Sequence, residues 1–211
     1  MFDPKIFLST FGTGRKMMTF KKGHIIFAQG DPSLSFFVVQ AGSVRLCAKS
    51  QDGKVATLDI LGPTDFVGED SISGQLIRTS SASALTDCTL LRIDTAAMML
   101  ALDYGGTLSN TFCSYVLARN IRYQQDLVNF RCNSSEMRLA RVLLQHSHFD
   151  HNSPETVVIK INHQILANMV GTTRSRVCGF MKKFKNAGYI DYIEKKPGLR
   201  IRQSLLAFYT Q

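Results

Sequence analysis

The feature that most limits the possible folds of this chain is a change in the distribution of glycine and proline near residue 106. Before that point, short apolar runs alternate with glycines such as Gly23, Gly42 and Gly62. After Gly106, no glycine or proline occurs until Pro154. Short runs bounded by glycine are typical of strands joined by tight turns, whereas a long stretch lacking both residues favours helices. The sequence therefore predicts an N-terminal β domain followed by helices.

Two strong turn signals lie within the N-terminal part. Gly30-Asp31-Pro32 separates one pair of apolar runs, and Asp52-Gly53 separates another. Asp-Gly between apolar runs is a typical hairpin turn because both residues tolerate positive φ angles. Several short strands at this spacing predict a small antiparallel barrel or sandwich.

The stretch without glycine carries two apolar stripes at helical spacing. A helix with two apolar faces packs against two partners. We expect these to be the β domain of its own chain and the same helix of a second copy. The alternative is an ordinary core helix. The first stripe is Cys113, Val116, Asn120, Tyr123, Leu127 and Phe130, and the second is Leu117, Ile121 and Val128.

The remaining residues read as helix, strand, helix-turn-helix and hairpin. "MRLARVLLQHSHF" predicts a helix, capped by Asn133 or Ser135, and "VVIKI" predicts a strand. Two helices then meet at a tight turn at Gly171, and "YIDYI" and "LRIR" predict a hairpin. Two helices joined by a short turn containing glycine form the DNA-binding helix-turn-helix, and this order of elements is that of a winged helix.

Most of the positive charge lies in this last part of the chain. The formal net charge is +9 at pH 7, and residues 154–211 hold 10 Lys and Arg against 3 Asp and Glu, which gives +7. Such a surplus suits nucleic acid, although basic surfaces also serve membranes and acidic proteins. No apolar run approaches the length of a membrane span, and no signal for secretion is present. The five scattered cysteines lack a Cys-x-x-Cys pair, which indicates the cytoplasm.

The second helix of the helix-turn-helix begins with many hydrogen-bond donors. Thr172 or Thr173 can cap it, and Arg174 has the shape that grips a guanine edge. The predicted hairpin turn, Lys195-Lys196-Pro197-Gly198, is basic and fits against a phosphate backbone. The alternative is a winged helix used for protein contacts.

Together these segments resemble the cAMP receptor protein/FNR family of bacterial transcription regulators. The resemblance covers nearly the whole chain and rests on "GHIIFAQGD…FFVVQAGSVRL", "FVGEDSISGQLIRTSSASA" and "INHQILANMVGTTRSRVCGFMKKF". It implies an α+β homodimer with a cyclic-nucleotide-binding-type β-roll (1–106), a long dimerisation helix (107–133) and a C-terminal winged helix-turn-helix (134–211). It also implies double-stranded DNA and RNA polymerase as partners, with no membrane. No catalytic motif is present, so we expect no enzyme activity.

The resemblance assigns DNA contacts to individual positions. Arg174 and Ser175 occupy the leading base-contacting positions. A third such position falls on Gly179, which has no side chain, so we expect a target sequence different from that of the type member. Backbone-contact positions fall on or near Thr173, Arg176, His163 and Gln164.

The resemblance also implies an effector pocket in the β-roll. Arg78 and Thr79 would hold a cyclic phosphate that Gly68 lets approach the backbone. Glu69 would accept a hydrogen bond from a ribose hydroxyl, and Arg119 could pair with Glu69. The positions that contact the base fall on Tyr123 and Gln124. The resemblance therefore implies a cyclic nucleotide, cAMP or cGMP, as a candidate effector.

Three departures from the family pattern leave other effectors open. Asp70 places a further negative charge near the phosphate, Ser71 and Ser80 replace small apolar residues, and the base-contacting pair differs. The alternatives are another small ligand, or no ligand with Glu69 and Arg78 as a structural ion pair. No cysteine precedes Cys47 and the histidines near residue 148 lack further ligands, so no metal cofactor is expected. A β-roll adaptor that uses its C-terminal domain for protein contacts is the competing class of function.

Overall fold

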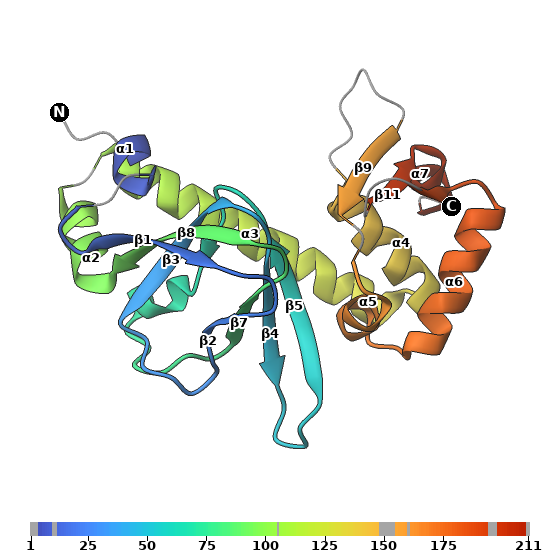
Figure 1. Cartoon of the computed structure of the whole chain (residues 1–211), viewed down its shortest axis with the longest axis horizontal. Coiled ribbons are helices and arrows are strands. Elements are labelled where there is room, and N and C mark those ends of the chain that lie inside the picture. The colour runs from blue at the N-terminus through green and yellow to red at the C-terminus, as the bar shows by residue number, and fades with distance from the viewer. Residues whose placement is uncertain are drawn as a thin grey trace. The chain divides into compact units, whose positions relative to one another are not determined.

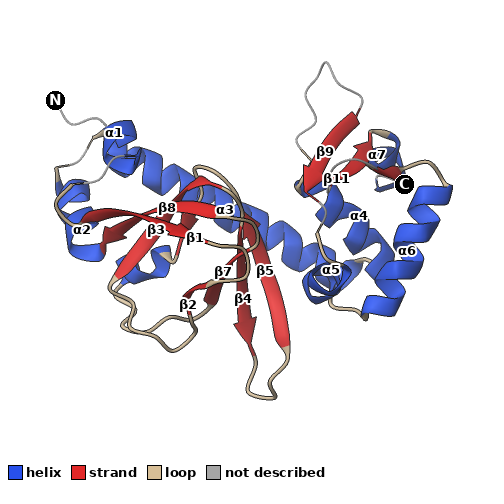
Figure 2. Cartoon of the chain, in the orientation of Figure 1, coloured by secondary structure: helices blue, strands red, loops and turns tan. Residues whose placement is uncertain are grey.

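A computed structural model describes residues 4–9, 12–104, 106–147, 155–159, 161–193 and 198–209. The chain divides into two compact units, Met1–Asn120 and Ile121–Gln211. Strands dominate the first unit and helices the second (Figure 2). No helix among the described residues is long and apolar enough to cross a membrane.

Two antiparallel four-stranded sheets form the first unit (Figure 1). Their strand orders are β1-β8-β3-β6 and β2-β7-β4-β5. The predicted antiparallel β domain is therefore confirmed, and Gly53, with a φ of 80°, turns the chain between β4 and β5. The strands are β1 (Arg15–Phe20), β2 (Ile25–Phe27), β3 (Ser35–Ala41), β4 (Val44–Lys49), β5 (Val55–Leu61), β6 (Phe66–Val67), β7 (Ser81–Ala84) and β8 (Cys88–Asp94).

Strand β3 is buried on both faces because successive side chains point to opposite sides of a strand. Phe37 and Val39 lie in an apolar cluster that draws residues from both sheets. Phe36 and Val38 lie in a second cluster, which joins the first sheet to the helices. Those helices are α1 (Pro4–Ser9), α2 (Thr95–Asp103) and the beginning of α3 (Thr107–Cys132). The 3₁₀ helix η1 (Glu69–Ser73) follows β6.

The face that α3 turns to the β domain differs from the predicted one. Leu108, Phe112 and Tyr115 pack into the second cluster, and Arg119 on the same side is buried. The apolar side chains of both predicted stripes, by contrast, are exposed within the chain, and the bulky ones among them are 37% to 60% exposed. The prediction that one stripe packs on the β domain was wrong. The face that makes this contact includes the charged Arg119, so it does not show up as an apolar stripe in the sequence.

The second unit contains the predicted helix, strand, helix-turn-helix and hairpin. Strands β10, β11 and β9 form an antiparallel sheet in that order. Ser134 caps α4 by accepting a hydrogen bond from the Met137 amide at 3.3 Å, so neither Asn133 nor Ser135 is the cap. The elements are α4 (Ser135–Gln145), β9 (Glu155–Ile159), α5 (His163–Val170), α6 (Arg174–Asn186), β10 (Ile190–Tyr192), β11 (Gly198–Arg202) and α7 (Ser204–Tyr209), of which α7 was not predicted.

The end of α3 is fixed to this unit by specific contacts. The Arg141 side chain donates a hydrogen bond to Asp126 at 3.0 Å. Arg138 stacks its guanidinium 4.6 Å from the centre of the Phe130 ring and donates to the Phe130 carbonyl at 2.8 Å. The second compact unit consequently includes the last part of α3 as well as the winged helix.

Candidate functional site

The turn of the helix-turn-helix depends on Gly171. This residue ends α5 with a φ of 64°, and its amide donates to the Ala167 carbonyl. The ring of Phe130 lies so close that a Cβ atom at position 171 would be 2.6 Å from a ring carbon. Both the left-handed backbone and the lack of space therefore require glycine here.

The first turn of α6 presents basic and hydroxyl side chains to solvent. Thr173 is the cap, and its hydroxyl oxygen accepts a hydrogen bond from the Arg176 amide at 3.3 Å. The proton of that hydroxyl stays available for a phosphate oxygen. Arg174, Ser175 and Arg176 are all exposed, and no acidic residue occupies the turn. The positive end of the helix dipole and the two guanidinium groups therefore create a positive potential that would attract an anion.

His163 and Gln164 at the start of α5 are already engaged with neighbours. The His163 Nδ1 atom lies 3.1 Å from the Cys178 sulfur on α6, so this contact joins the two helices. The Gln164 side chain donates to the Asn168 side chain at 3.0 Å. The Gln164 backbone amide donates to the side chain of Asn162, the cap of α5. Of the predicted hairpin turn, Lys195 to Pro197 lie outside the described residues.

Gly179 lies in the middle of α6 and is exposed. A Cβ atom there would meet nothing within 4 Å, so the glycine is not required by packing within the chain. The predicted base-contacting position therefore faces solvent without a side chain.

The two glycines of this motif predict opposite effects of alanine. We expect Gly171→Ala to lower the free energy of unfolding by about 1–2 kcal/mol, because of its left-handed φ and the nearby Phe130 ring. We expect Gly179→Ala to raise it by about 0.5–1 kcal/mol, because alanine favours a helix interior. Thermal unfolding followed by circular dichroism measures both, and each variant is the control for the other. Equal changes of the same sign would contradict this account.

In the first unit, Gly68 and Arg78 lie in contact. Gly68 follows β6 with a φ of 80°, and a Cβ atom there would collide with the Arg78 guanidinium. Arg78 is 3% exposed, donates to the carbonyls of Gly68 and Ser35, and stacks 4.1 Å from the centre of the Phe27 ring. Burial lowers the pKa of Arg78, and the nearby Asp70 opposes that change. The guanidinium remains charged and is held rigidly.

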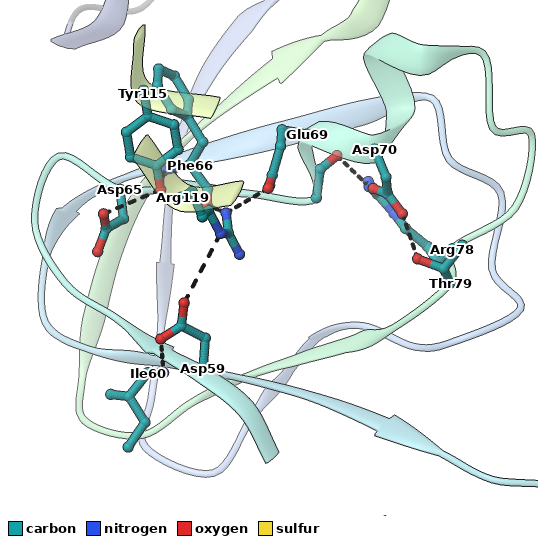
Figure 3. Close-up of polar contacts among 11 residues, drawn as sticks. Asp59, Ile60, Asp65, Phe66, Glu69, Asp70, Arg78, Thr79, Tyr115 and Arg119 are labelled. Atoms are coloured by element: carbon teal, nitrogen blue, oxygen red, sulfur yellow. Dashed lines mark hydrogen bonds and ion pairs between the residues drawn. The ribbon is translucent and has the colours of Figure 1, made fainter. Parts of the chain in front are cut away.

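Asp70 bridges the two side chains predicted to hold a phosphate. One carboxylate oxygen lies 3.5 Å from Arg78 Nη1, and the other accepts a hydrogen bond from the Thr79 hydroxyl at 2.9 Å. Figure 3 shows the Asp70 carboxylate between Arg78 and Thr79, while Glu69 points toward Arg119. We call Gly68, Arg78 and Thr79 the anion cradle.

Arg119 forms the expected ion pair with Glu69 and a second one that the sequence did not indicate. Its Nη1 atom lies 2.5 Å from Glu69 and donates to the Phe66 carbonyl at 3.0 Å. Its Nε atom lies 4.0 Å from Asp59. One turn earlier, Tyr115 donates to Asp65 at 3.2 Å, and burial raises the pKa of the Tyr115 hydroxyl well above its usual range.

The structure brings together the predicted effector residues of the first unit, whereas two others belong to the second unit. Gly68, Arg78 and Thr79 form the cradle, and Glu69 and Arg119 form the adjacent pair. Tyr123 and Gln124 follow on α3 in the second compact unit, where the Arg122 guanidinium lies 5.7 Å from the centre of the Tyr123 ring. Their role toward a base stays a prediction.

Metal-ligating side chains do not cluster in the described part of the chain. No group of three or more His, Cys, Asp and Glu side chains there could hold a metal ion. His148 and His151, which the sequence places near His146, lie outside the described residues.

Comparisons with known proteins match a different family model to each of the two compact units. Residues 17–103 match the model of the cyclic nucleotide-binding domain, and residues 137–204 match that of the Crp-like helix-turn-helix domain. The transcriptional regulator SdrP of Thermus thermophilus is 31% identical over 181 residues, which are 83% of this chain and 85% of SdrP.

Two further matches have lower sequence identity. The CRP-like cAMP-activated global transcriptional regulator of Mycobacterium tuberculosis is 27% identical over 175 residues, covering 81% of this chain and 78% of that protein. The solved structure of a CRP/FNR-family transcriptional regulator from Thermus thermophilus has a TM-score of 0.70 and 22% identity. It covers 93% of this chain and 99% of its own.

Proposed function

Because the chain belongs to the CRP/FNR family of transcription regulators and is not an enzyme, we propose that it binds specific double-stranded DNA as a homodimer. We further propose that a small effector in its β-roll controls this binding. The domains in this proposal are the roll (1–106), the dimerisation helix (107–133) and the winged helix (134–211). The protein would act in the cytoplasm together with RNA polymerase.

The exposed first turn of α6 is the observation that carries the DNA-binding proposal. Arg174 and Ser175 would meet base edges, while Thr173 and Arg176 would meet phosphates. Gln164 and His163 would contribute backbone contacts from α5. A surface that served a protein partner would not need this concentration of donors at a capped helix start with no acidic residue.

The exposed stripes of α3 support the homodimer. Seven large apolar side chains on one helix are each at least 37% exposed within the chain, and pairing with a second copy of α3 would bury them. In a two-fold dimer the recognition helices would be separated by about one turn of DNA, as two half-sites require. The residues are Val116, Leu117, Ile121, Tyr123, Leu127, Val128 and Phe130.

For the effector, we propose a small anionic ligand, with cAMP or cGMP as the first candidates. The match to a cyclic nucleotide-binding domain supports a site in the roll, and a relative that is cAMP-activated supports this ligand class. The cradle of Gly68, Arg78 and Thr79 would hold the phosphate, and Glu69 with Arg119 would lie beside the ribose. Tyr123 and Gln124 would meet the base. Binding would shift the population of α3 arrangements and so the spacing of the recognition helices.

A selection experiment tests the DNA-binding proposal directly. Wild-type protein is used to enrich duplexes from a randomised library, and the enriched sequence is then footprinted. We expect a palindromic site protected over two half-sites, with an affinity that falls steeply with salt because phosphate contacts release counterions. If no sequence is enriched while the protein is folded, the adaptor role of the C-terminal domain replaces this proposal.

A lysine on the exposed stripes should break the dimer. We expect Ile121→Lys to raise the dimer dissociation constant by about 10- to 100-fold, because a buried lysine without a partner disfavours the interface. Leu100→Lys is the matched control, because Leu100 on α2 is also exposed but lies off α3. Sedimentation equilibrium measures both. Dimers that tolerate the lysine at position 121 would place the interface elsewhere.

A further inference from the structure

We infer that the Asp70 carboxylate occupies the anion position of the cradle, so that a cyclic nucleotide must displace it and binds the wild-type roll only weakly. Its two oxygens lie on Arg78 Nη1 and on the Thr79 hydroxyl, at 3.5 and 2.9 Å. These are the two side chains that would hold two oxygens of a phosphate. The inference rests on the proposed effector site, and it names the residue that decides what this site accepts.

Arg78 has no freedom to serve a phosphate elsewhere. It is 3% exposed, stacks on Phe27, and donates to the Gly68 and Ser35 carbonyls. Since these contacts fix the guanidinium, an incoming anion must take the place of the Asp70 carboxylate (Figure 3).

Displacement of Asp70 is unfavourable for three reasons. The carboxylate is part of the same chain and competes at a high effective concentration, whereas a ligand must come from solution. A cyclic phosphate carries a single negative charge, so it gains no charge advantage over the carboxylate it replaces. After displacement, Asp70 stays within a few ångströms of the bound phosphate and repels it.

The neighbouring acidic residue does not have this effect. Glu69 points toward Arg119 and pairs with it at 2.5 Å (Figure 3). Two adjacent carboxylates therefore serve two arginines in different directions, and only that of Asp70 fills the cradle. Asp70 keeps its side chain 25% exposed, so its replacement leaves no buried cavity.

The test is to remove the charge and retain the shape. We expect Asp70→Asn to bind cAMP or cGMP at least about tenfold more tightly than wild-type protein, measured by calorimetry on the full chain. Wild-type protein should bind the same nucleotide correspondingly more weakly. Asp52→Asn makes the same change of charge in the exposed turn between β4 and β5, and should behave as the wild type.

Two further variants keep the result open to contradiction. Asp70→Ala also removes the carboxylate and should bind nucleotide even if asparagine disturbs the cradle. Adding Thr79→Val to Asp70→Asn should reverse part of the gain, because the hydroxyl would then be missing; Thr79 is exposed, so the fold should persist. Wild-type binding equal to that of Asp70→Asn would overturn the inference. So would the absence of binding in both folded Asp70 variants.

Failure of this inference can be separated from failure of the proposed function. The DNA affinity of each sample is measured without nucleotide on the enriched duplex. Nucleotide binding gained by Asp70→Asn in a protein that binds no specific DNA would refute only the regulator proposal. Specific DNA binding by a chain whose Asp70 variants ignore nucleotides would refute only the inference about Asp70.

Discussion

Replacing Arg174 by alanine should weaken binding of the dimer to its specific site by about 30- to 20,000-fold. A bidentate contact between arginine and guanine contributes about 1–3 kcal/mol of discrimination, and a two-fold dimer makes this contact twice. Arg174 is exposed in the first turn of α6, so the variant should keep the stability of the wild type. Fluorescence anisotropy with the enriched duplex and with a scrambled duplex measures the loss of specificity.

Arg176→Ala is the matched control for this result. It removes the same charge from the same helical turn, but from a residue assigned to phosphate. We expect it to weaken both duplexes similarly and to reduce the slope of log affinity against log salt. If Arg174→Ala also weakened both duplexes equally, Arg174 would be a backbone contact and the assigned reading position would be wrong.

Replacing Arg119 by methionine should lower the free energy of unfolding of the first unit by about 3 kcal/mol or more. Removing one partner of a buried ion pair leaves the other charge without compensation. Arg119 is 6% exposed, and the carboxylates of Glu69 and Asp59 lie on either side of it. Arg119→Lys keeps the charge but loses the fork of donors, so it should cost less.

Lys21→Met supplies the comparison for a surface ion pair. Lys21 and Asp87 lie 2.9 Å apart, but their side chains are 78% and 63% exposed. Water screens such a pair, so we expect little change in stability. The chain has no tryptophan, so tryptophan fluorescence cannot report its unfolding. Hydrogen exchange of the β5 and β6 amides in urea is therefore the suitable measurement of stability. Equal losses in the two methionine variants would contradict the assigned importance of Arg119.

The helix-turn-helix was predictable because its signals are local. The predicted tight turn occurs at Gly171, and Thr173, one of the two predicted caps, begins α6. Helical spacing accounts for the apolar face of α6, on which Val177, Met181 and Phe184 are buried and Phe180 is half-buried.

The β-roll site was only partly predictable, because its contacts come from distant segments. Arg119 meets Asp59 and Glu69 across about 50 to 60 residues of sequence, and only the tertiary fold brings them together. The presence of Asp70 was visible as an extra charge, but the direction of its side chain was not. The face of α3 that packs on the β domain was missed for the same reason. Arg119 interrupts the apolar pattern of that face, and the partners of Arg119 lie on other elements.

The fixed end of α3 has a consequence for building hybrid regulators from this chain. Asp126 is tied to Arg141, and the Phe130 ring lies against the Gly171 turn. A hybrid that joins a foreign sensor domain at residue 134 would lose both contacts. The winged helix would then no longer be fixed to the helix that precedes it. A junction near residue 121, at the boundary between the two units, would keep both contacts. A rotation of α3 imposed by the new sensor domain would then be transmitted to α5.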